Sequence, residues 1–118
     1  MKITQAFTLE AAHHLPLVPD THRCKRLHGH SYRIELELDG PVDGRTGFVA
    51  DFFDVEAAFA PLHEALDHRL LNEVPGLENP TAERIALWIW ERMKGALPLL
   101  SAVRVFETPD CWAEYRGD

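Results

Sequence analysis

The stretch "HSYRIELELDG", residues 30–40, decides the fold because apolar and charged side chains alternate cleanly along it. The apolar residues are Tyr32, Ile34, Leu36 and Leu38, and the charged residues are Arg33, Glu35, Glu37 and Asp39. A period of two is typical of a strand with one buried face. Gly40 and Pro41 then predict the end of the strand.

Outward from this strand, the pattern changes between strand and helix. "KITQAFTLEAA", residues 2–12, alternates and predicts another strand. Residues 54–72 and 81–98 carry apolar residues at helical spacing and predict two helices. We expect Asp54 to cap the first helix, and Asn79 or Thr81 to cap the second. Pro61 fits the first helix only if it lies in the first turns.

The last segment, "SAVRVFETPDCWAEYRG" at residues 101–117, predicts a strand, a turn at Pro109 and Asp110, and a closing strand. The expected order is therefore two strands, two helices and two strands. Strands and helices that come in separate runs favour an α+β fold with an antiparallel sheet. Without repeats, low-complexity tracts or linkers, residues 1–118 are expected to form a single domain.

Composition and charge exclude several classes of function. The net charge of −7 argues against nucleic-acid binding, which needs a basic patch or stripe. No apolar run approaches the roughly 18 residues of a membrane span. The N-terminal sequence lacks the apolar core of a signal peptide, so we expect a cytoplasmic protein. The two cysteines do not make a disulfide framework.

Five of the seven histidines lie within the first 30 residues, and two of them flank a glycine in "CKRLHGHS", residues 24–31. On a strand, His28 and His30 point to the same face. His13 shares the parity of the buried positions Leu9 and Ala11, whereas His14 has the opposite parity. We therefore favour His13 as a third ligand. Three imidazoles with an open fourth position are typical of catalytic zinc, while the alternative is a group of ordinary surface or core histidines.

Cys24 is a candidate nucleophile or base because it precedes His28 by four residues and lies among Arg23, Lys25 and Arg26. Nearby positive charge raises the thiolate fraction of a cysteine. The alternative is a small residue packed in a loop. Cys111 has no histidine near it in the sequence and is expected only to pack.

Two carboxylates also stand out. Asp67 precedes His68 at the end of the first predicted helix, where a carboxylate can orient an imidazole. Adjacent residues there rarely bond each other, so polar residues at a helix end are the simpler interpretation. Glu107 shares the apolar face of Val103 and Val105, and it would need a partner with two adjacent N–H groups if it were buried. Exposure at the strand end is the alternative.

Together these segments resemble the 6-pyruvoyltetrahydropterin synthase superfamily over nearly the whole chain. The matching stretches are "FTLEAAHHLP", "CKRLHGHS", "DGRTGFVADF", "LDHRLLN", "NPTAERIALWIW" and "VRVFET". The three residues between Cys24 and the His-Gly-His motif resemble the bacterial branch that makes 6-carboxytetrahydropterin for queuosine biosynthesis, because the pyruvoyl-forming animal enzymes typically place five there.

The resemblance implies a T-fold, with a four-stranded antiparallel sheet and two helices on one face. It also implies trimers that close their sheets into a barrel and stack as a homohexamer. By the same resemblance, the Zn²⁺ ligands are His13, His28 and His30, and the catalytic residues are Cys24, Asp67 and His68. Glu107 is then the residue that anchors the pterin. In the family the cysteine and the Asp-His pair come from neighbouring subunits.

The implied reaction converts 7,8-dihydroneopterin triphosphate to 6-carboxy-5,6,7,8-tetrahydropterin, acetaldehyde and triphosphate. Two rival hypotheses remain open. The first is 6-pyruvoyltetrahydropterin synthase activity at the same kind of site. The second is a zinc-binding module without turnover, against which Cys24, Asp67 and His68 argue, because a structural zinc does not need them.

Overall fold

The structure, a computed structural model, describes all 118 residues, and its centre is a long antiparallel pair of strands. β1 (Lys2–His13) pairs with β2 (His28–Asp39) from Lys2 opposite Asp39 to His13 opposite His28. Both strands were predicted, and both extend further than the sequence pattern indicated, toward the histidines. Because of this extension, two of the candidate ligands lie directly opposite each other in the sheet.

The sheet has five strands in the order β3-β1-β2-β4-β5. β4 (Leu100–Thr108) and β5 (Cys111–Tyr115) continue the antiparallel pattern. The α+β class is confirmed, but the expected four-stranded antiparallel sheet is incomplete. β3 (Arg69–Leu70) adds a short parallel strand beside Ala11 and Ala12 of β1. Two residues are too few to produce a recognisable alternation, so the sequence pattern could not predict this strand.

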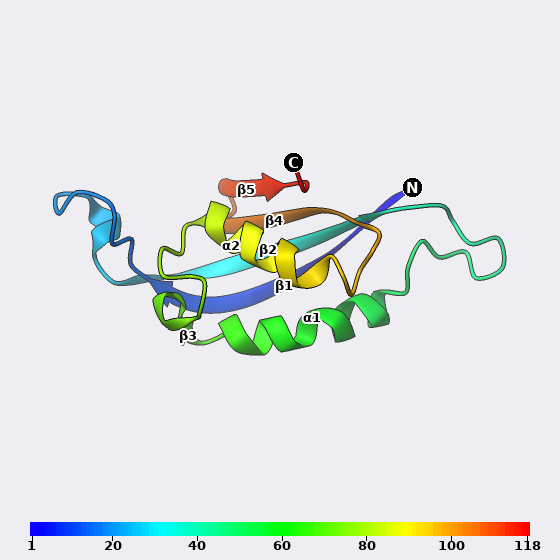
Figure 1. The fold of residues 1–118 in the computed structure, drawn as a ribbon, viewed down its shortest axis with the longest axis horizontal. Coiled ribbons are helices and arrows are strands. Elements are labelled where there is room, and N and C mark those ends of the chain that lie inside the picture. Colours follow the sequence, from blue (N-terminus) through cyan, green and yellow to red (C-terminus); the bar gives the residue numbers. More distant parts are fainter.

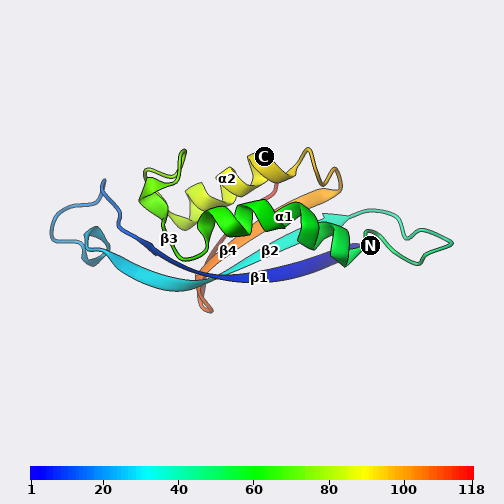
Figure 2. The same cartoon turned by 90° about the horizontal axis from the view of Figure 1, so that it is seen from below.

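Both helices cover the same face of the sheet (Figures 1 and 2). α1 (Phe52–Leu66) begins after Asp51, whose carboxylate accepts a hydrogen bond from the N–H of Phe53 at 2.8 Å. The predicted cap at Asp54 was therefore wrong by three residues. Pro61 lies inside the helix rather than in its first turns. It is tolerated because Pro61 and Ala57 are both exposed, so water can reach the carbonyl that loses its helical partner.

α2 (Ala82–Met93) is capped by Thr81, whose hydroxyl accepts a hydrogen bond from the N–H of Arg84 at 3.1 Å. Ile85, Ile89 and Met93 form its buried face, as predicted. The core lies between the helices and the apolar side of β2, where Ile34 and other residues are fully buried. Neither helix combines the length and the apolar character that a bilayer crossing requires.

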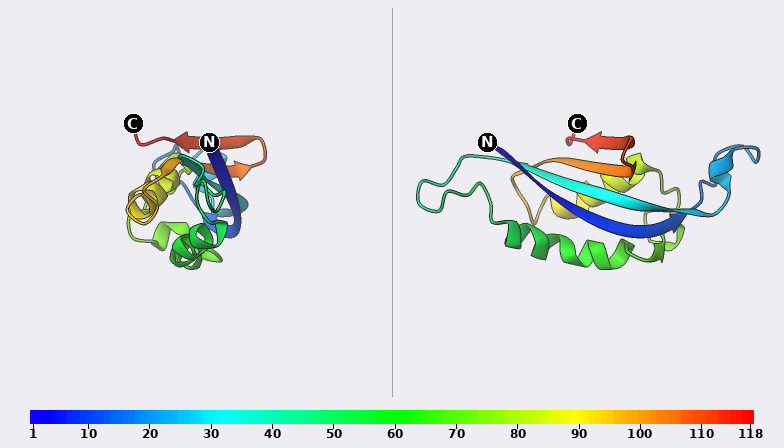
Figure 3. Two further views of the ribbon diagram at one scale, coloured as in Figure 1. Left: turned by 90° about the vertical axis from the view of Figure 1, so that its right-hand side faces the viewer. Right: turned by 180° about the vertical axis from the view of Figure 1, so that it is seen from behind.

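The molecule is elongated, with extents of 56 × 24 × 23 Å, because β1 and β2 are each 12 residues long. A loop of residues 14–27 projects from the end of the sheet where His13 and His28 lie (Figures 1 and 3). It contains one short 3-10 turn, η1 (Arg23–Lys25). A second loop, residues 40–51, projects from the opposite end (Figure 3). Another single turn, η2 (Leu71–Glu73), follows β3.

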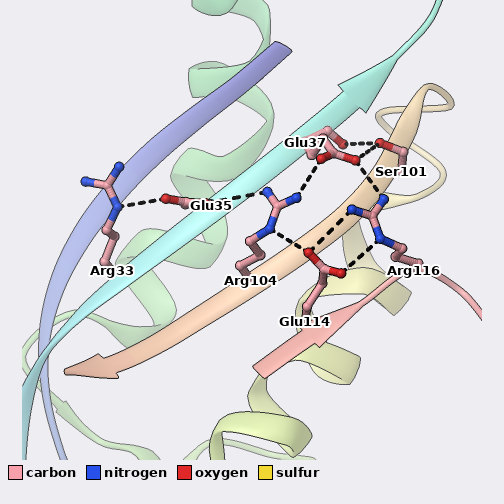
Figure 4. Close-up of polar contacts among 7 residues, drawn as sticks. All are labelled: Arg33, Glu35, Glu37, Ser101, Arg104, Glu114 and Arg116. Atoms are coloured by element: carbon pink, nitrogen blue, oxygen red, sulfur yellow. Dashed lines mark hydrogen bonds and ion pairs between the residues drawn. The ribbon is translucent and has the colours of Figure 1, made fainter. Parts of the chain in front are cut away.

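The helix-free face of the sheet carries a group of ion pairs that we call the charge network (Figure 4). Its centre is Glu37, which is only 4% exposed although it lies on a face without a helix. Arg104 and Arg116 donate to its two carboxylate oxygens at 2.6 and 2.9 Å, and Ser101 donates at 2.7 Å. Glu114 accepts from both arginines and closes the network.

Candidate metal centre and catalytic residues

Three imidazoles meet at the end of the β1–β2 pair. His13 ends β1, and His28 and His30 begin β2, so the strand register places all three on the helix-covered face. One ring nitrogen from each histidine lies within 4.8 Å of the others. His13 is buried, whereas His28 and His30 are half-buried. The cluster can therefore hold one ion and still leave an approach from solvent.

The hydrogen bonds of His13 and His28 fix which ring nitrogen faces the centre. Nδ1 of His13 lies 2.8 Å from the carbonyl oxygen of Pro80, and Nδ1 of His28 lies 2.7 Å from that of Arg26. Because a carbonyl can only accept, each Nδ1 carries the proton and each neutral ring turns a lone pair on Nε2 inward. These two Nε2 atoms are 2.9 Å apart. Two facing lone pairs repel each other, and a bound cation would satisfy both, so the donor set fits a divalent metal.

Electrostatics also favour the neutral rings that a metal requires. Burial lowers the pKa of His13, and the neighbouring His28 and His30 lower it further, while the Pro80 carbonyl and Glu107 oppose this. Burial likewise lowers the pKa of His30 against the opposing charge of Glu107. For His13 and His30, burial therefore favours the neutral imidazole, the form that binds a metal.

His14 follows the end of β1 and is not part of the histidine cluster, and its backbone is held by a residue that sequence reasoning missed. Asn72 accepts a hydrogen bond from the N–H of His14 at 3.0 Å and donates one to its carbonyl at 2.8 Å. The Asn72 amide thus satisfies both backbone groups of His14, as a paired strand would if the sheet continued beyond β1. Its position in "LDHRLLN" offered no periodic signal that could have revealed this contact.

Asp67 and His68 do bond each other, contrary to the expectation for adjacent residues at a helix end. Nδ1 of His68 lies 2.9 Å from Oδ2 of Asp67. His68 has a φ of 57°, and this left-handed conformation folds its ring back toward the preceding carboxylate. Such a conformation in a residue other than glycine is strained and is frequent at functional sites.

The main chain of Glu10 in β1 fixes this Asp-His pair. Its N–H donates to Oδ1 of Asp67 at 2.9 Å, and its carbonyl accepts from the N–H of His68. The first of these bonds, followed by the contact with His68, lowers the pKa of Asp67 and keeps it ionised. The ionised carboxylate accepts the Nδ1–H of His68 and so leaves Nε2 of this exposed ring free for proton transfer.

A cavity of about 560 Å³ opens beside the Asp-His pair. It is lined by Glu10, Ala11, Ala12, Gly29, His30, Ser31, His68, Arg69 and Leu70. Ser31 donates to the Glu10 carboxylate at 2.6 Å on its wall. One candidate metal ligand, His30, and one candidate acid–base residue, His68, therefore line the same cavity.

Cys24 does not line this cavity. It lies half-buried in η1, where its N–H donates to Nδ1 of His22 at 3.0 Å and its carbonyl accepts from Leu15. Lys25, expected to act on the thiol, instead donates to the carbonyls of Pro16 and Val18. Within one chain, then, the structure groups the histidines and separately groups Asp67 with His68, and it does not bring Cys24 to that pair.

Glu107 lies near the end of β4, in phase with Val105, and is half-buried. Its charge raises the pKa of His13, His30 and Tyr32, which places the carboxylate within electrostatic reach of the histidine cluster. It lines a hollow of about 430 Å³ together with Ala82, Glu83, Cys111, Trp112, Ala113 and Glu114. No protein donor holds the Glu107 carboxylate by a hydrogen bond, so its oxygens are available to a ligand.

An α+β fold with three imidazoles able to hold a metal defines the class of a candidate metalloenzyme. A family model described as 6-pyruvoyl tetrahydropterin synthase matches residues 2–118. The chain therefore belongs to the 6-pyruvoyl tetrahydropterin synthase family, a family of pterin lyases.

Individual relatives within this family carry different activities. A 6-carboxy-5,6,7,8-tetrahydropterin synthase from Synechocystis sp. is 40% identical over 96% of this chain and 91% of its own length. A dihydroneopterin monophosphate aldolase from Pyrococcus furiosus is 39% identical over 63% of this chain and 61% of its own. The solved structure of Caenorhabditis elegans 6-pyruvoyl tetrahydropterin synthase matches with a TM-score of 0.90 and 25% identity, covering 100% of this chain and 96% of that one.

Proposed function

We propose that this protein is a zinc-dependent lyase that converts 7,8-dihydroneopterin triphosphate and water to 6-carboxy-5,6,7,8-tetrahydropterin, acetaldehyde and triphosphate, as a step of queuosine biosynthesis. The observation that carries the proposal is the pair of inward Nε2 lone pairs of His13 and His28, with His30 beside them. The similarity to the Synechocystis enzyme over nearly the whole chain supports this reaction over the others of the family. We expect residues 1–118 to act as one domain in the cytoplasm.

The metal is held by His13, His28 and His30 in this proposal. A zinc ion bound there supplies positive charge to the oxygens of the substrate side chain. Zinc suits three imidazoles with one open position better than a closed structural site, which usually contains cysteines. The half-buried rings of His28 and His30 leave the open side toward solvent and the substrate.

Proton transfers are assigned to Cys24, Asp67 and His68. Cys24, as a thiolate, removes a proton from the substrate side chain, and His68 returns or relays protons through Nε2 while Asp67 holds its Nδ1–H. Because Cys24 and the Asp-His pair lie apart within one chain, we infer that a second subunit completes the site. From the resemblance to the family we propose a homohexamer, a dimer of trimers, in which neighbouring subunits supply these groups.

Glu107 positions the pterin ring. Its carboxylate has no hydrogen-bonding partner in the protein and lies beside the histidine cluster, so it can accept two parallel N–H groups from the ring. Such a bidentate contact fixes the orientation of the ring, and with it the position of the side chain relative to the imidazoles.

The test is a product assay with the purified protein, its zinc content measured in parallel. We expect acetaldehyde and 6-carboxytetrahydropterin from 7,8-dihydroneopterin triphosphate. A pyruvoyl product without acetaldehyde would instead assign the 6-pyruvoyltetrahydropterin synthase reaction. Aldol cleavage of a dihydroneopterin monophosphate, with no turnover of the triphosphate, would overturn the proposed substrate.

The variant Cys24→Ser separates an enzyme from a zinc-binding module. We expect it to keep its zinc and to lose at least about 100-fold in kcat, since proton transfer by a positioned group contributes on the order of 10²–10⁴-fold. Unchanged turnover in this variant would remove Cys24 from the mechanism. Zinc binding by the wild type without any turnover of a pterin would support the module.

A further inference from the structure

Tyr32 is the one fully buried side chain whose polar group reaches the histidine cluster from β2. It is 0% exposed and follows His30 by two residues, so both side chains lie on the helix-covered face of the strand. Its ring packs edge-on against two candidate ligands, with centroid distances of 5.9 Å to His13 and 5.3 Å to His30. Its hydroxyl lies 3.1 Å from Nδ1 of His13.

The direction of this hydrogen bond follows from the other partner of the same nitrogen. Pro80 offers Nδ1 of His13 a carbonyl, which can only accept, so Nδ1 carries a proton. The Tyr32 oxygen therefore accepts a share of that N–H, and the two oxygens hold the ring from two sides.

Packing alone does not explain a hydroxyl at this position. A buried tyrosine hydroxyl requires a partner, whereas phenylalanine would fill nearly the same volume without that requirement. The hydroxyl of Tyr32 makes its hydrogen bond with a candidate metal ligand rather than with the surrounding main chain. In metal sites, the group that binds the second nitrogen of a histidine fixes its tautomer and its ring orientation.

We propose that Tyr32 is a positioning residue for the metal centre: together with the Pro80 carbonyl, its hydroxyl fixes the protonated Nδ1 and the orientation of His13, so that Nε2 faces the ion. This inference rests on the proposed metal site. Tyr32 touches neither the ion nor the substrate, and it acts only through His13. Its loss changes the affinity for the metal and the geometry around it before it changes anything else.

The experiment compares Tyr32→Phe with the wild type and with Tyr115→Phe as a matched control. The Tyr115 hydroxyl contacts only the carbonyl of Asp118, away from the histidines. Each metal-free protein is titrated with Co²⁺ in competition with a chelator, and the visible spectrum of the bound Co²⁺ is recorded. We expect Tyr32→Phe to bind Co²⁺ roughly 10- to 100-fold more weakly, with shifted absorption bands, because loss of such an outer contact typically has this effect.

Co²⁺ affinity and spectrum equal to those of the wild type in folded Tyr32→Phe would overturn the inference while leaving the metal site intact. A wild type that binds no Co²⁺ at all would overturn the proposed metal site itself, so the two failures are distinguishable. A second measurement needs no variant. In the zinc-loaded wild type, the Nδ1 proton of His13 should exchange slowly with solvent in NMR spectra, and an absent or rapidly exchanging proton would contradict its double hydrogen bond.

Discussion

Two polar clusters lie on opposite faces of β2, and they differ in one respect. In the charge network on the helix-free face, each carboxylate oxygen of Glu37 accepts from at least one donor (Figure 4). In the histidine cluster on the helix-covered face, the Nδ1 atoms of His13 and His28 have carbonyl partners, but their Nε2 lone pairs face each other. The first cluster is satisfied within the chain, whereas the second leaves two facing lone pairs that a bound cation would satisfy.

This difference separates structural polar groups from functional ones. Buried polar groups are almost always satisfied within the protein, and each exception calls for an explanation. The charge network therefore stabilises the sheet and needs no ligand. The histidine cluster keeps electron pairs available at the end of the sheet, next to the cavity of His68. Substitutions in one cluster should therefore affect stability, and substitutions in the other should affect metal binding.

The largest effect is expected from His28→Ala. Removing one of three ligands should lower zinc affinity by more than about 100-fold, beyond the effect of losing an outer contact. The zinc content of the purified protein then falls from about one ion per chain toward zero. His14→Ala is the matched control, because His14 is also half-buried but does not belong to the cluster. Zinc content is measured by elemental analysis. An equal loss of zinc in both variants would contradict the assignment of His28 as a metal ligand.

Next in size is the effect of Asp67→Asn on turnover. The amide replaces the oxygen that accepts the Nδ1–H of His68, so the ring loses its fixed tautomer. We expect kcat to fall on the order of 10²–10⁴-fold, with zinc content and KM nearly unchanged. Asp43→Asn is a suitable control, since the Asp43 carboxylate likewise accepts hydrogen bonds from backbone N–H groups, those of Arg45 and Thr46, but lies in the 40–51 loop at the opposite end of the sheet (Figure 3). An equal loss of kcat in the control would argue against a role for the Asp-His pair.

In the charge network, Glu37→Gln should destabilise the fold without affecting zinc. The neutral amide leaves Arg104 and Arg116 with Glu114 as their remaining shared carboxylate. We expect a loss of about 2 kcal/mol in the free energy of unfolding, less than for a fully buried pair, because Arg116 is partly exposed. Urea unfolding of the metal-free protein measures this loss. A drop in zinc content instead would show that the two clusters are coupled.

The same carboxylate predicts a dependence of stability on pH. Burial alone would raise the pKa of Glu37, but the hydrogen bonds from Ser101, Arg104 and Arg116 outweigh it and lower the pKa from 4.5 to about 2. A carboxyl group with a lowered pKa stabilises the fold fully above its unfolded value, and this contribution is lost as the pH falls toward about 2. Urea unfolding at several pH values should show a steeper decline in the wild type than in Glu37→Gln, and parallel curves would contradict this assignment.

The smallest effect is expected at the edge of the same network, from Arg33→Ala. Arg33 pairs with Glu35 at 2.9 Å, but its side chain is 56% exposed. We expect a change of less than about 0.5 kcal/mol in the free energy of unfolding, as for most surface ion pairs. A loss as large as that of Glu37→Gln would mean that the solvent exposure of an ion pair does not determine how much it contributes to the free energy of unfolding.

The sequence predicted the helices and strands whose apolar residues recur with a clear period. It did not predict tertiary contacts, which leave no periodic pattern. The alternation of β2 and the helical spacing of α2 were sufficient to predict both elements and their buried faces. The parity of His13 and His14 indicated which of them belongs to the cluster, although the position of His13 directly opposite His28 depended on the register. Three features arise from tertiary geometry, and no local pattern predicts them. They are the left-handed conformation of His68, the two hydrogen bonds of Asn72 with the backbone of His14, and the contact of Tyr32 with His13.

The most direct test of the account is X-ray absorption spectroscopy at the zinc edge of the purified protein. Three inward imidazoles predict three histidine nitrogens at about 2.0–2.1 Å, one further light atom at the open position, and no sulfur in the first coordination shell. A sulfur neighbour at about 2.3 Å, or fewer than three imidazoles, would contradict the assignment of His13, His28 and His30 as the ligands.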